Sequence, residues 1–251
     1  MSLARVACVV PATDAADRVG AAVAAARALP GVDIVIVTDD GSSDATAQVA
    51  GAAGAIVVTH ARSRGRAAAI ESAVNALGVL EQRDRRHECG TLLLIDGHLG
   101  ADVGAGAPLL EPIRSGDADL AIGVSGRPVR GFVVEAATRG VAELTGGWTT
   151  RAAITAPRCL TRRAFELASP LAAGWGADVG MSVDVVRAGL RVVEIELEIE
   201  PRGVAALEQA AQLRDVTRAL AARGLVQDKA KELRSEFEAG GVRGLFDRFR
   251  R

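Results

Sequence analysis

The sequence predicts an α/β fold, with a doubly wound, mostly parallel mixed sheet, helices on both faces and a helical C-terminal tail. Three observations support this prediction. Short apolar, β-branched runs alternate with Ala-rich helical stretches through the first half of the chain. Some of these runs are apolar at nearly every position, as expected for strands covered on both faces. Parallel strands also need crossover helices between them, which this alternation supplies.

The first elements each have a local reason. Residues 5–11 form a β-branched run that ends at Pro11, so we expect a strand there. Residues 14–29 are Ala-rich with valines at helical spacing and stop before Pro30, which predicts a helix. Residues 33–38 are almost uninterruptedly apolar, which predicts a strand buried on both faces.

The remaining elements follow in the same alternation, and the second half is less regular. Ser43 and Asp44 can cap a helix that runs to about residue 53. Further strands are expected at 55–59, 91–95, 119–123 and 190–199, and further helices at 64–80, 108–114, 132–144, 162–167 and 177–188. We expect one domain over residues 1–223 and a helical tail over 224–251.

Composition excludes several classes of protein. The chain has 30 basic and 31 acidic residues, so no global field would hold a nucleic acid. Aromatic residues make up 3% and tyrosine is absent, which argues against base-stacking platforms. The three cysteines, Cys8, Cys89 and Cys159, are far apart and are expected to be buried thiols in a reducing compartment. No apolar stretch approaches the ~20 residues that span a bilayer, so we expect a cytoplasmic protein.

Two acidic clusters follow predicted strands. Residues 39–46, Asp-Asp-Gly-Ser-Ser-Asp-Ala-Thr, follow the second strand, and Asp96-Gly97-His98 follows the fourth. In open α/β sheets, ligands bind beyond the carboxyl ends of the strands. The sequence therefore predicts a ligand site at this edge, whereas His60 and His87 are expected at the surface or at strand ends without a chemical role.

These segments together resemble family 2 of the glycosyltransferases, which have the GT-A fold. Residues 39–46 resemble the nucleotide-binding signature of that family, and Pro11-Ala12 matches the end of its first strand. Residues 64–69, Arg-Gly-Arg-Ala-Ala-Ala, resemble the Gly-Lys-Gly-Ala-Ala stretch that opens its third helix. Residues 174–194 resemble its acidic helix and late strand. The resemblance covers about residues 5–220.

The resemblance implies a nucleotide-sugar donor and a divalent cation, Mn²⁺ or Mg²⁺. Asp39 and Asp40 would hold the nucleoside beside Pro11 and Ala12, with Asp39 accepting from an imino N–H of uracil or guanine. Asp96, with His98, would bind the cation that bridges the donor diphosphate.

The remaining implied site residues are basic or lie on the acidic helix. Arg64 and Arg66 would add positive charge at a helix start, and Arg158 would contact a phosphate or pair with a carboxylate. Asp178 would be a general base for the acceptor hydroxyl or would orient the sugar.

Four departures from the family pattern leave alternatives open. Residues 13–16, Thr-Asp-Ala-Ala, replace an Asn-Glu pair, and His98 replaces the second metal-binding acid. Residues 155–158 keep only the arginine of a Ser-Gly-Gln-Arg segment, and residues 200–203 lack a late histidine. The alternative is therefore a degenerate protein that acts by binding. A nucleotidyltransferase ranks lower, because no Gly-rich phosphate loop follows the first strand.

The last ten residues predict an amphipathic basic helix. Val242, Leu245, Phe246 and Phe249 share one helix face, and arginines surround them. This face would pack on its own domain or on a second copy in a homodimer. The alternative is peripheral contact of residues 242–251 with anionic lipid.

Overall fold

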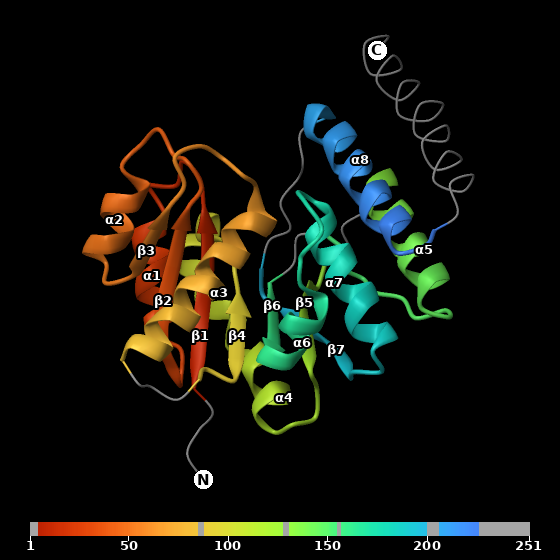
Figure 1. The fold of residues 1–251 in the computed structure, drawn as a ribbon, viewed down its shortest axis with the longest axis horizontal. Helices are drawn as coiled ribbons and strands as arrows, with labels where there is room; N and C mark the ends of the chain where they lie inside the picture. The colour runs from red at the N-terminus through yellow and green to blue at the C-terminus, as the bar shows by residue number, and fades with distance from the viewer. Residues whose placement is uncertain (1–4, 85–87, 128–130, 155–156, 200–205, 226–251) are drawn as a thin grey trace.

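A computed structural model of the chain describes residues 5–84, 88–127, 131–154, 157–199 and 206–225. Its centre is a seven-stranded sheet with the order β3-β2-β1-β4-β6-β5-β7 (Figure 1). The strands are β1 (Val6–Ala12), β2 (Val32–Asp39), β3 (Ile56–Thr59), β4 (Thr91–Leu94), β5 (Leu120–Ser125), β6 (Arg158–Thr161) and β7 (Val192–Leu197). The helices are α1 (Val19–Ala28), α2 (Thr46–Ala52), α3 (Arg66–Arg83), the 3₁₀ segment η1 (Gly97–Leu109), α4 (Leu110–Arg114), α5 (Phe132–Leu144), α6 (Arg162–Ala168), α7 (Gly176–Arg187) and α8 (Ala206–Ala222).

The sheet is mixed and mostly parallel, as predicted. β1 pairs in parallel with β2 and β4, β2 with β3, and β5 with β7. β6 runs antiparallel to both of its neighbours, β4 and β5. The carboxyl ends of all the other strands therefore lie along one edge, and the amino end of β6 lies at that same edge.

Alternating side chains of β1 enter two cores. Cys8 and Val10 pack on one face with α1, η1 and α4, whereas Ala7 and Val9 pack on the other face with α3, α6 and α7. This period of two is the signature of a strand buried on both sides. Cys8, Cys89 and Cys159 are buried free thiols, as predicted, and burial raises the pKa of Cys89 to about 11.

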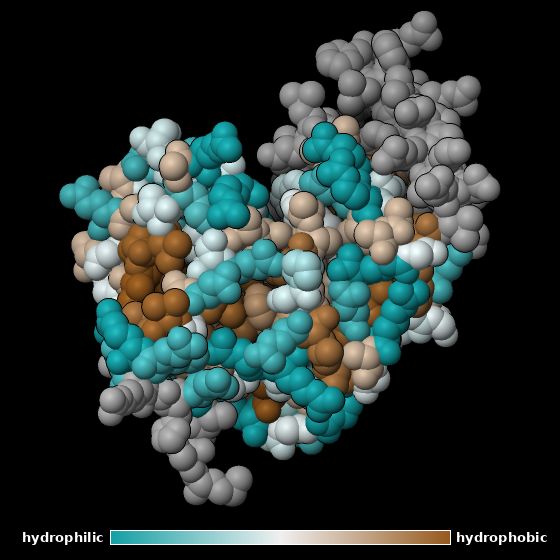
Figure 2. All heavy atoms as spheres, in the orientation of Figure 1, coloured by the Kyte–Doolittle hydropathy of each residue, from teal (hydrophilic) through white to brown (hydrophobic). Residues whose placement is uncertain are grey.

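A third core lies outside the sheet. Apolar residues of α5, α7 and α8 pack on one another, including Val141, Val183 and Leu220. Figure 1 shows these helices grouped beside the β6–β5–β7 end, away from α1 and α2. Hydrophilic side chains form bands across the face seen in Figure 2, and that surface is notched at its upper edge between the β1–β3 side and α8.

Three sequence predictions need correction. The first helix begins at Val19 rather than at Asp14, because the residues before it form a loop bonded to the 42–46 segment. The helix expected at 108–114 begins at Leu110, because residues 108 and 109 belong to η1, which kinks at Gly100. The segment 158–161 is a strand that the sequence analysis did not predict.

Other predictions lie outside the described residues or are only partly covered. The tail after residue 225, the lipid-binding segment 242–251, His87 and residues 200–203 are outside them. Among the described helices, none is long and apolar enough to cross a membrane.

Candidate functional site

The carboxyl ends of β1, β2 and β4 bring the predicted nucleotide residues together. Ala12 is in register with Asp39 across β1 and β2, and the amide of Asp40 donates to the carbonyl of Ala12 at 2.8 Å. Gly97, directly after Asp96, lies against Ala12 and the carbonyl of Pro11 so closely that an added Cβ would lie 3.0 Å from the Ala12 Cβ. Strand order reverses between β1 and β4, which is where open α/β sheets bind ligands.

Asp39 closes a tight turn at the end of β2. Its side chain is buried, and its Oδ1 accepts from the amide and the hydroxyl of Ser42. The hydrogen bond from the Ser42 amide to Oδ1 is 3.2 Å long. Because Oδ2 takes no hydrogen bond within the described part of the chain, it is the oxygen left to accept from a ligand.

The loop after β1 is tied to the 42–46 segment. Asp14 has a positive φ of 46°, and its carboxylate accepts from the amide of Ser43 at 2.7 Å and from the Ser43 hydroxyl at 3.0 Å. The amide of Ala15 donates to the Thr46 hydroxyl at 2.8 Å. Ser43 and Thr46 therefore hold the loop after β1 in place. One carboxylate oxygen of Asp14 is occupied by Ser43.

Asp40 is buried and is held by donors from within the protein. Its oxygens accept from the hydroxyl of Ser63 and from the amides of Arg64 and Gly65, each at 2.8 Å, and His60 lies at 2.6 Å. Burial alone would raise the pKa of Asp40, but these hydrogen bonds outweigh burial and hold it below its ordinary value. The sequence analysis placed Asp40 on the nucleoside, whereas here its oxygens are occupied by the loop before α3.

Asp96 and His98 lie next to each other after β4. The Oδ1 of Asp96 accepts from the backbone amide of His98 at 2.9 Å and so caps the start of η1. Both side chains are half-buried. No group of three or more His, Cys, Asp or Glu side chains that could hold a metal is found among the described residues. Within the described ranges, Asp96 and His98 are thus the two side chains of this segment that could bind a cation.

Arg66, Asp178 and Arg158 form one buried ionic cluster. Arg66 at the start of α3 donates to Asp178 Oδ1 at 2.9 Å, and the Nε of Arg158 lies 3.2 Å from the same oxygen. Arg158 is fully buried and also donates to the Ser182 hydroxyl at 2.9 Å. Burial lowers the pKa of Arg158, and Asp178 opposes this shift. Of the two outcomes left open for Arg158, the structure supports pairing with a carboxylate.

The cluster stands at the same edge as Asp39. Arg158 begins the antiparallel strand β6 and pairs with Leu94 at the end of β4, two residues before Asp96. Two guanidinium groups and one carboxylate give the cluster a net charge of +1. Arg66 is its solvent-reaching member, with 19% of its side chain exposed against 0% for Arg158.

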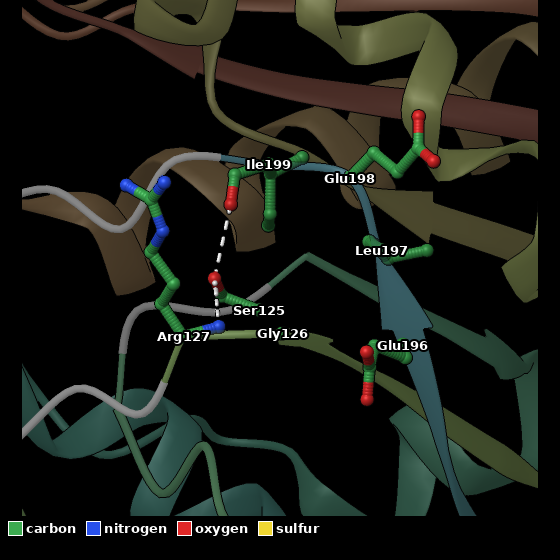
Figure 3. A pocket seen from close by; sticks show the side chains of 7 residues that line it. All are labelled: Ser125, Gly126, Arg127, Glu196, Leu197, Glu198 and Ile199. Atoms are coloured by element: carbon green, nitrogen blue, oxygen red, sulfur yellow. Dashed lines mark hydrogen bonds between the residues drawn. The ribbon is translucent and has the colours of Figure 1, made fainter.

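A cavity of about 470 Å³ opens at the ends of β5 and β7. It is lined by Ser125, Gly126, Arg127, Glu196, Leu197, Glu198 and Ile199 (Figure 3). The hydroxyl of Ser125 accepts from the Arg127 amide and donates to the carbonyl of Ile199 at 3.0 Å, which ties the two strand ends together. Because β5 and β7 are parallel to β1–β4, this cavity is on the predicted ligand edge.

Two features of this edge escaped the sequence analysis. His60 lies at a strand end as predicted, but it is buried against Asp40. The cavity lining was also not predicted, because residues 125–127 look like a solvated turn until β7 is placed beside them. The sequence signal was the place of Asp40 at the end of an apolar strand, because a carboxylate buried there needs a partner such as His60.

Solved structures share this fold. Glucosyl-3-phosphoglycerate synthase from Mycobacterium tuberculosis, in complex with Mn²⁺, UDP-glucose and phosphoglyceric acid, is 25% identical, with a TM-score of 0.72 over 87% of this chain and 79% of that one. Its complex with Mn²⁺, UDP and phosphoglyceric acid is 24% identical, with a TM-score of 0.73 over 88% and 79%. A mycobacterial protein is 27% identical, with a TM-score of 0.71 over 87% and 74%. The comparison with curated proteins gave no match.

The sequence itself matches a family model over the part that contains the carboxyl ends of β1, β2 and β4. The matched residues are 7–133, and the family is described as glycosyl transferase family 2. The match covers half of the 251 residues. It includes β1 from its second residue and all of β2 to β5, and with them Asp39, Arg66 and Asp96. The chain therefore belongs to glycosyl transferase family 2.

Proposed function

We propose that the protein transfers a sugar from a UDP-linked donor to an acceptor hydroxyl. The observation that supports this best is the common edge of Asp39, Asp96 and the Arg66–Asp178–Arg158 cluster at the reversal of strand order. Asp39 would accept from the imino N–H of the base with its second carboxylate oxygen. The diphosphate would then extend toward the positive cluster.

Arg66 and Arg64 would bind the donor diphosphate. Arg66 is half-buried at the first position of α3, and Arg64 is exposed two residues earlier. A helix N-terminus and guanidinium groups both favour anions. Negative charge develops on the leaving nucleoside diphosphate during transfer, so these groups would stabilise the transition state.

A divalent cation fits beside Asp96 where the donor supplies further oxygens. Mg²⁺ and related ions are commonly held by one or two carboxylates together with substrate phosphates. The solved glucosyl-3-phosphoglycerate synthases bind Mn²⁺ or Mg²⁺ with UDP. When bound, such an ion neutralises charge on the diphosphate. Asp96, with His98 as second ligand, would hold it here.

Asp178 would orient Arg66 and the sugar rather than remove the acceptor proton. Its Oδ1 accepts from Arg66 at 2.9 Å and lies 3.2 Å from the Nε of Arg158, so two guanidinium groups already occupy this oxygen. Its burial inside the cluster also leaves little of it in contact with solvent. Of the two roles that the family resemblance implies for Asp178, the geometry supports the positioning one.

The acceptor would occupy the cavity at β5 and β7. This cavity is on the donor edge and has both basic and acidic side chains in Arg127, Glu196 and Glu198 (Figure 3). A small polar molecule with a free hydroxyl suits such a lining. Phosphoglyceric acid, which is bound in the solved neighbours, is the first acceptor to assay.

Calorimetric titration tests the donor. We expect UDP to bind more tightly than GDP, and UDP to bind more tightly with Mn²⁺ than without it. Incubation with UDP-glucose and phosphoglyceric acid, followed by detection of released UDP, tests transfer. A lack of nucleotide binding at millimolar concentration would exclude the transferase proposal.

The second candidate is a family member that binds nucleotides without transfer. Asp178 held between two arginines and a donor set without a third described metal ligand both favour it. It predicts that Asp96→Ala leaves the cellular phenotype intact, whereas the transferase predicts its loss. Release of pyrophosphate from a nucleoside triphosphate and a sugar phosphate would instead indicate a nucleotidyltransferase.

A further inference from the structure

His60 links the end of β3 to Asp40 and to α3. The imidazole is buried, with Nδ1 2.6 Å from Asp40 Oδ1 and Nε2 2.9 Å from the hydroxyl of Ser72. The ionised carboxylate of Asp40 can only accept, so Nδ1 carries the hydrogen. The Ser72 hydroxyl can donate or accept, so both ring nitrogens keep a partner.

The other hydrogen bonds of the Asp40 carboxylate come from a single loop, residues 61–65. Asp40 accepts from the Ser63 hydroxyl and from the amides of Arg64 and Gly65. The loop also lies directly on Gly41, where a Cβ would come within 2.5 Å of the Ser63 amide nitrogen. Asp40 and Gly41 therefore fix the entry into α3, and with it the backbone that bears Arg64 and leads to Arg66.

We propose that His60 is a positioning residue that acts through Asp40 to set the loop 61–65 and so the two arginines toward the donor diphosphate. This inference rests on the proposed function. The order of carboxylate, imidazole and hydroxyl also occurs in nucleophilic triads. Here, however, the carboxylate of Asp40 accepts its other hydrogen bonds from one loop. The geometry therefore supports an anchor for that loop.

Two amide substitutions separate the contacts of His60. In His60→Asn the side-chain nitrogen can take the place of Nδ1 and donate to Asp40, whereas in His60→Gln the amide reaches toward Ser72. We expect His60→Gln to weaken UDP binding about tenfold, because misplaced arginines lose charge-assisted hydrogen bonds to the terminal phosphate. UMP binding should change less than about twofold. His60→Asn should restore most of the UDP affinity.

Hydrogen exchange gives a readout that needs no ligand. The amides of Arg64 and Gly65 should exchange faster in His60→Gln than in the wild type and in His60→Asn. Ser72→Ala is the matched control, because it removes the outer contact of the imidazole and leaves the bond to Asp40. We expect it to change neither the exchange of these amides nor the ratio of UDP to UMP affinity.

Each outcome decides between the two proposals. Equal losses of UDP and UMP affinity in His60→Gln, or unchanged exchange of the two amides, would overturn the role of His60 alone. A wild-type protein that binds no UDP would overturn the proposed function and the diphosphate role of the loop 61–65. Hydrogen exchange of the Arg64 and Gly65 amides would still decide whether His60 holds this loop in place. If His60→Gln does not fold, Ser63→Ala removes one loop contact and should give a smaller loss selective for UDP.

Discussion

Two carboxylates at the ligand edge are stabilised in opposite ways. Asp40 accepts from neutral donors in a loop at most 25 positions away, and from one imidazole. Asp178 is held by two guanidinium groups, one of them 112 positions away. The first carboxylate shapes a local loop through directional hydrogen bonds. The second joins α3, β6 and α7 by charge, so its loss leaves a buried cation unpaired.

The largest effect is expected for Asp178→Asn. The substitution removes the counter-charge of Arg158, which is fully buried. Breaking such a pair costs about 3–5 kcal/mol, because the remaining charge stays desolvated. Urea unfolding of both proteins at neutral pH measures this loss.

The double variant Arg158→Met/Asp178→Asn is the control for that loss. Removing both charges leaves no unpaired buried cation, so its free energy of unfolding should lie above the value expected from adding the two single losses. Additive losses would show that the two charges do not depend on each other. The contrast with Asp40 would then disappear.

The second effect concerns the close contact between Gly41 and the loop 61–65. Gly41→Ala places a Cβ at a φ of +74° and within 2.5 Å of the Ser63 amide nitrogen. We expect a loss of about 3 kcal/mol, from left-handed strain together with the displaced loop. Gly116→Ala has a similar φ of +78° and nothing within 4 Å, so strain alone should cost about 1 kcal/mol. Equal losses in thermal unfolding would disprove the close approach.

The third effect should reveal the hydrogen bonds of Asp40 through pH. Asp40→Asn leaves at least one loop donor without an acceptor and should cost about 2 kcal/mol at neutral pH. Because the folded-state pKa of Asp40 is lowered, its stabilisation is present above the unfolded value of about 3.9 and is lost as pH falls through the folded value. The difference between the two proteins in urea unfolding should therefore shrink as the pH falls below about 4.

A difference that stays the same down to pH 2 would contradict this account. It would mean that the amide disturbs the loop by its shape and that the charge of Asp40 contributes nothing. The same series on Asp178→Asn gives the comparison between a carboxylate bonded to neutral donors and one paired with cations.

The sequence predicted the end of β2 that bears Asp40 better than the cluster around Asp178. Strands such as 33–38 have apolar runs that need no partner to be recognised, and Asp39 at a strand end is a local signal. β6 has only four residues, and its Arg158 is tolerated in the core because Asp178 neutralises it. That pairing depends on where α7 packs, which no local pattern contains. The contact of His60 with Asp40 also escaped prediction, because it depends on the pairing of β3 beside β2.

The smallest effect on stability is expected for Asp39→Asn, whose consequence is confined to binding. The Oδ1 of Asp39 accepts from Ser42, which an amide carbonyl can also do, so the melting temperature should change little. The other oxygen of residue 39, which is proposed to accept from the imino N–H of uracil, would no longer carry negative charge. A hydrogen bond to a charged group is worth about 1.5–3 kcal/mol, so UDP affinity should fall about tenfold or more in calorimetric titration. Unlike His60→Gln, this variant should weaken UMP and UDP equally, because both carry the same base. A loss confined to UDP would place Asp39 at the phosphates and would contradict the orientation proposed for the donor.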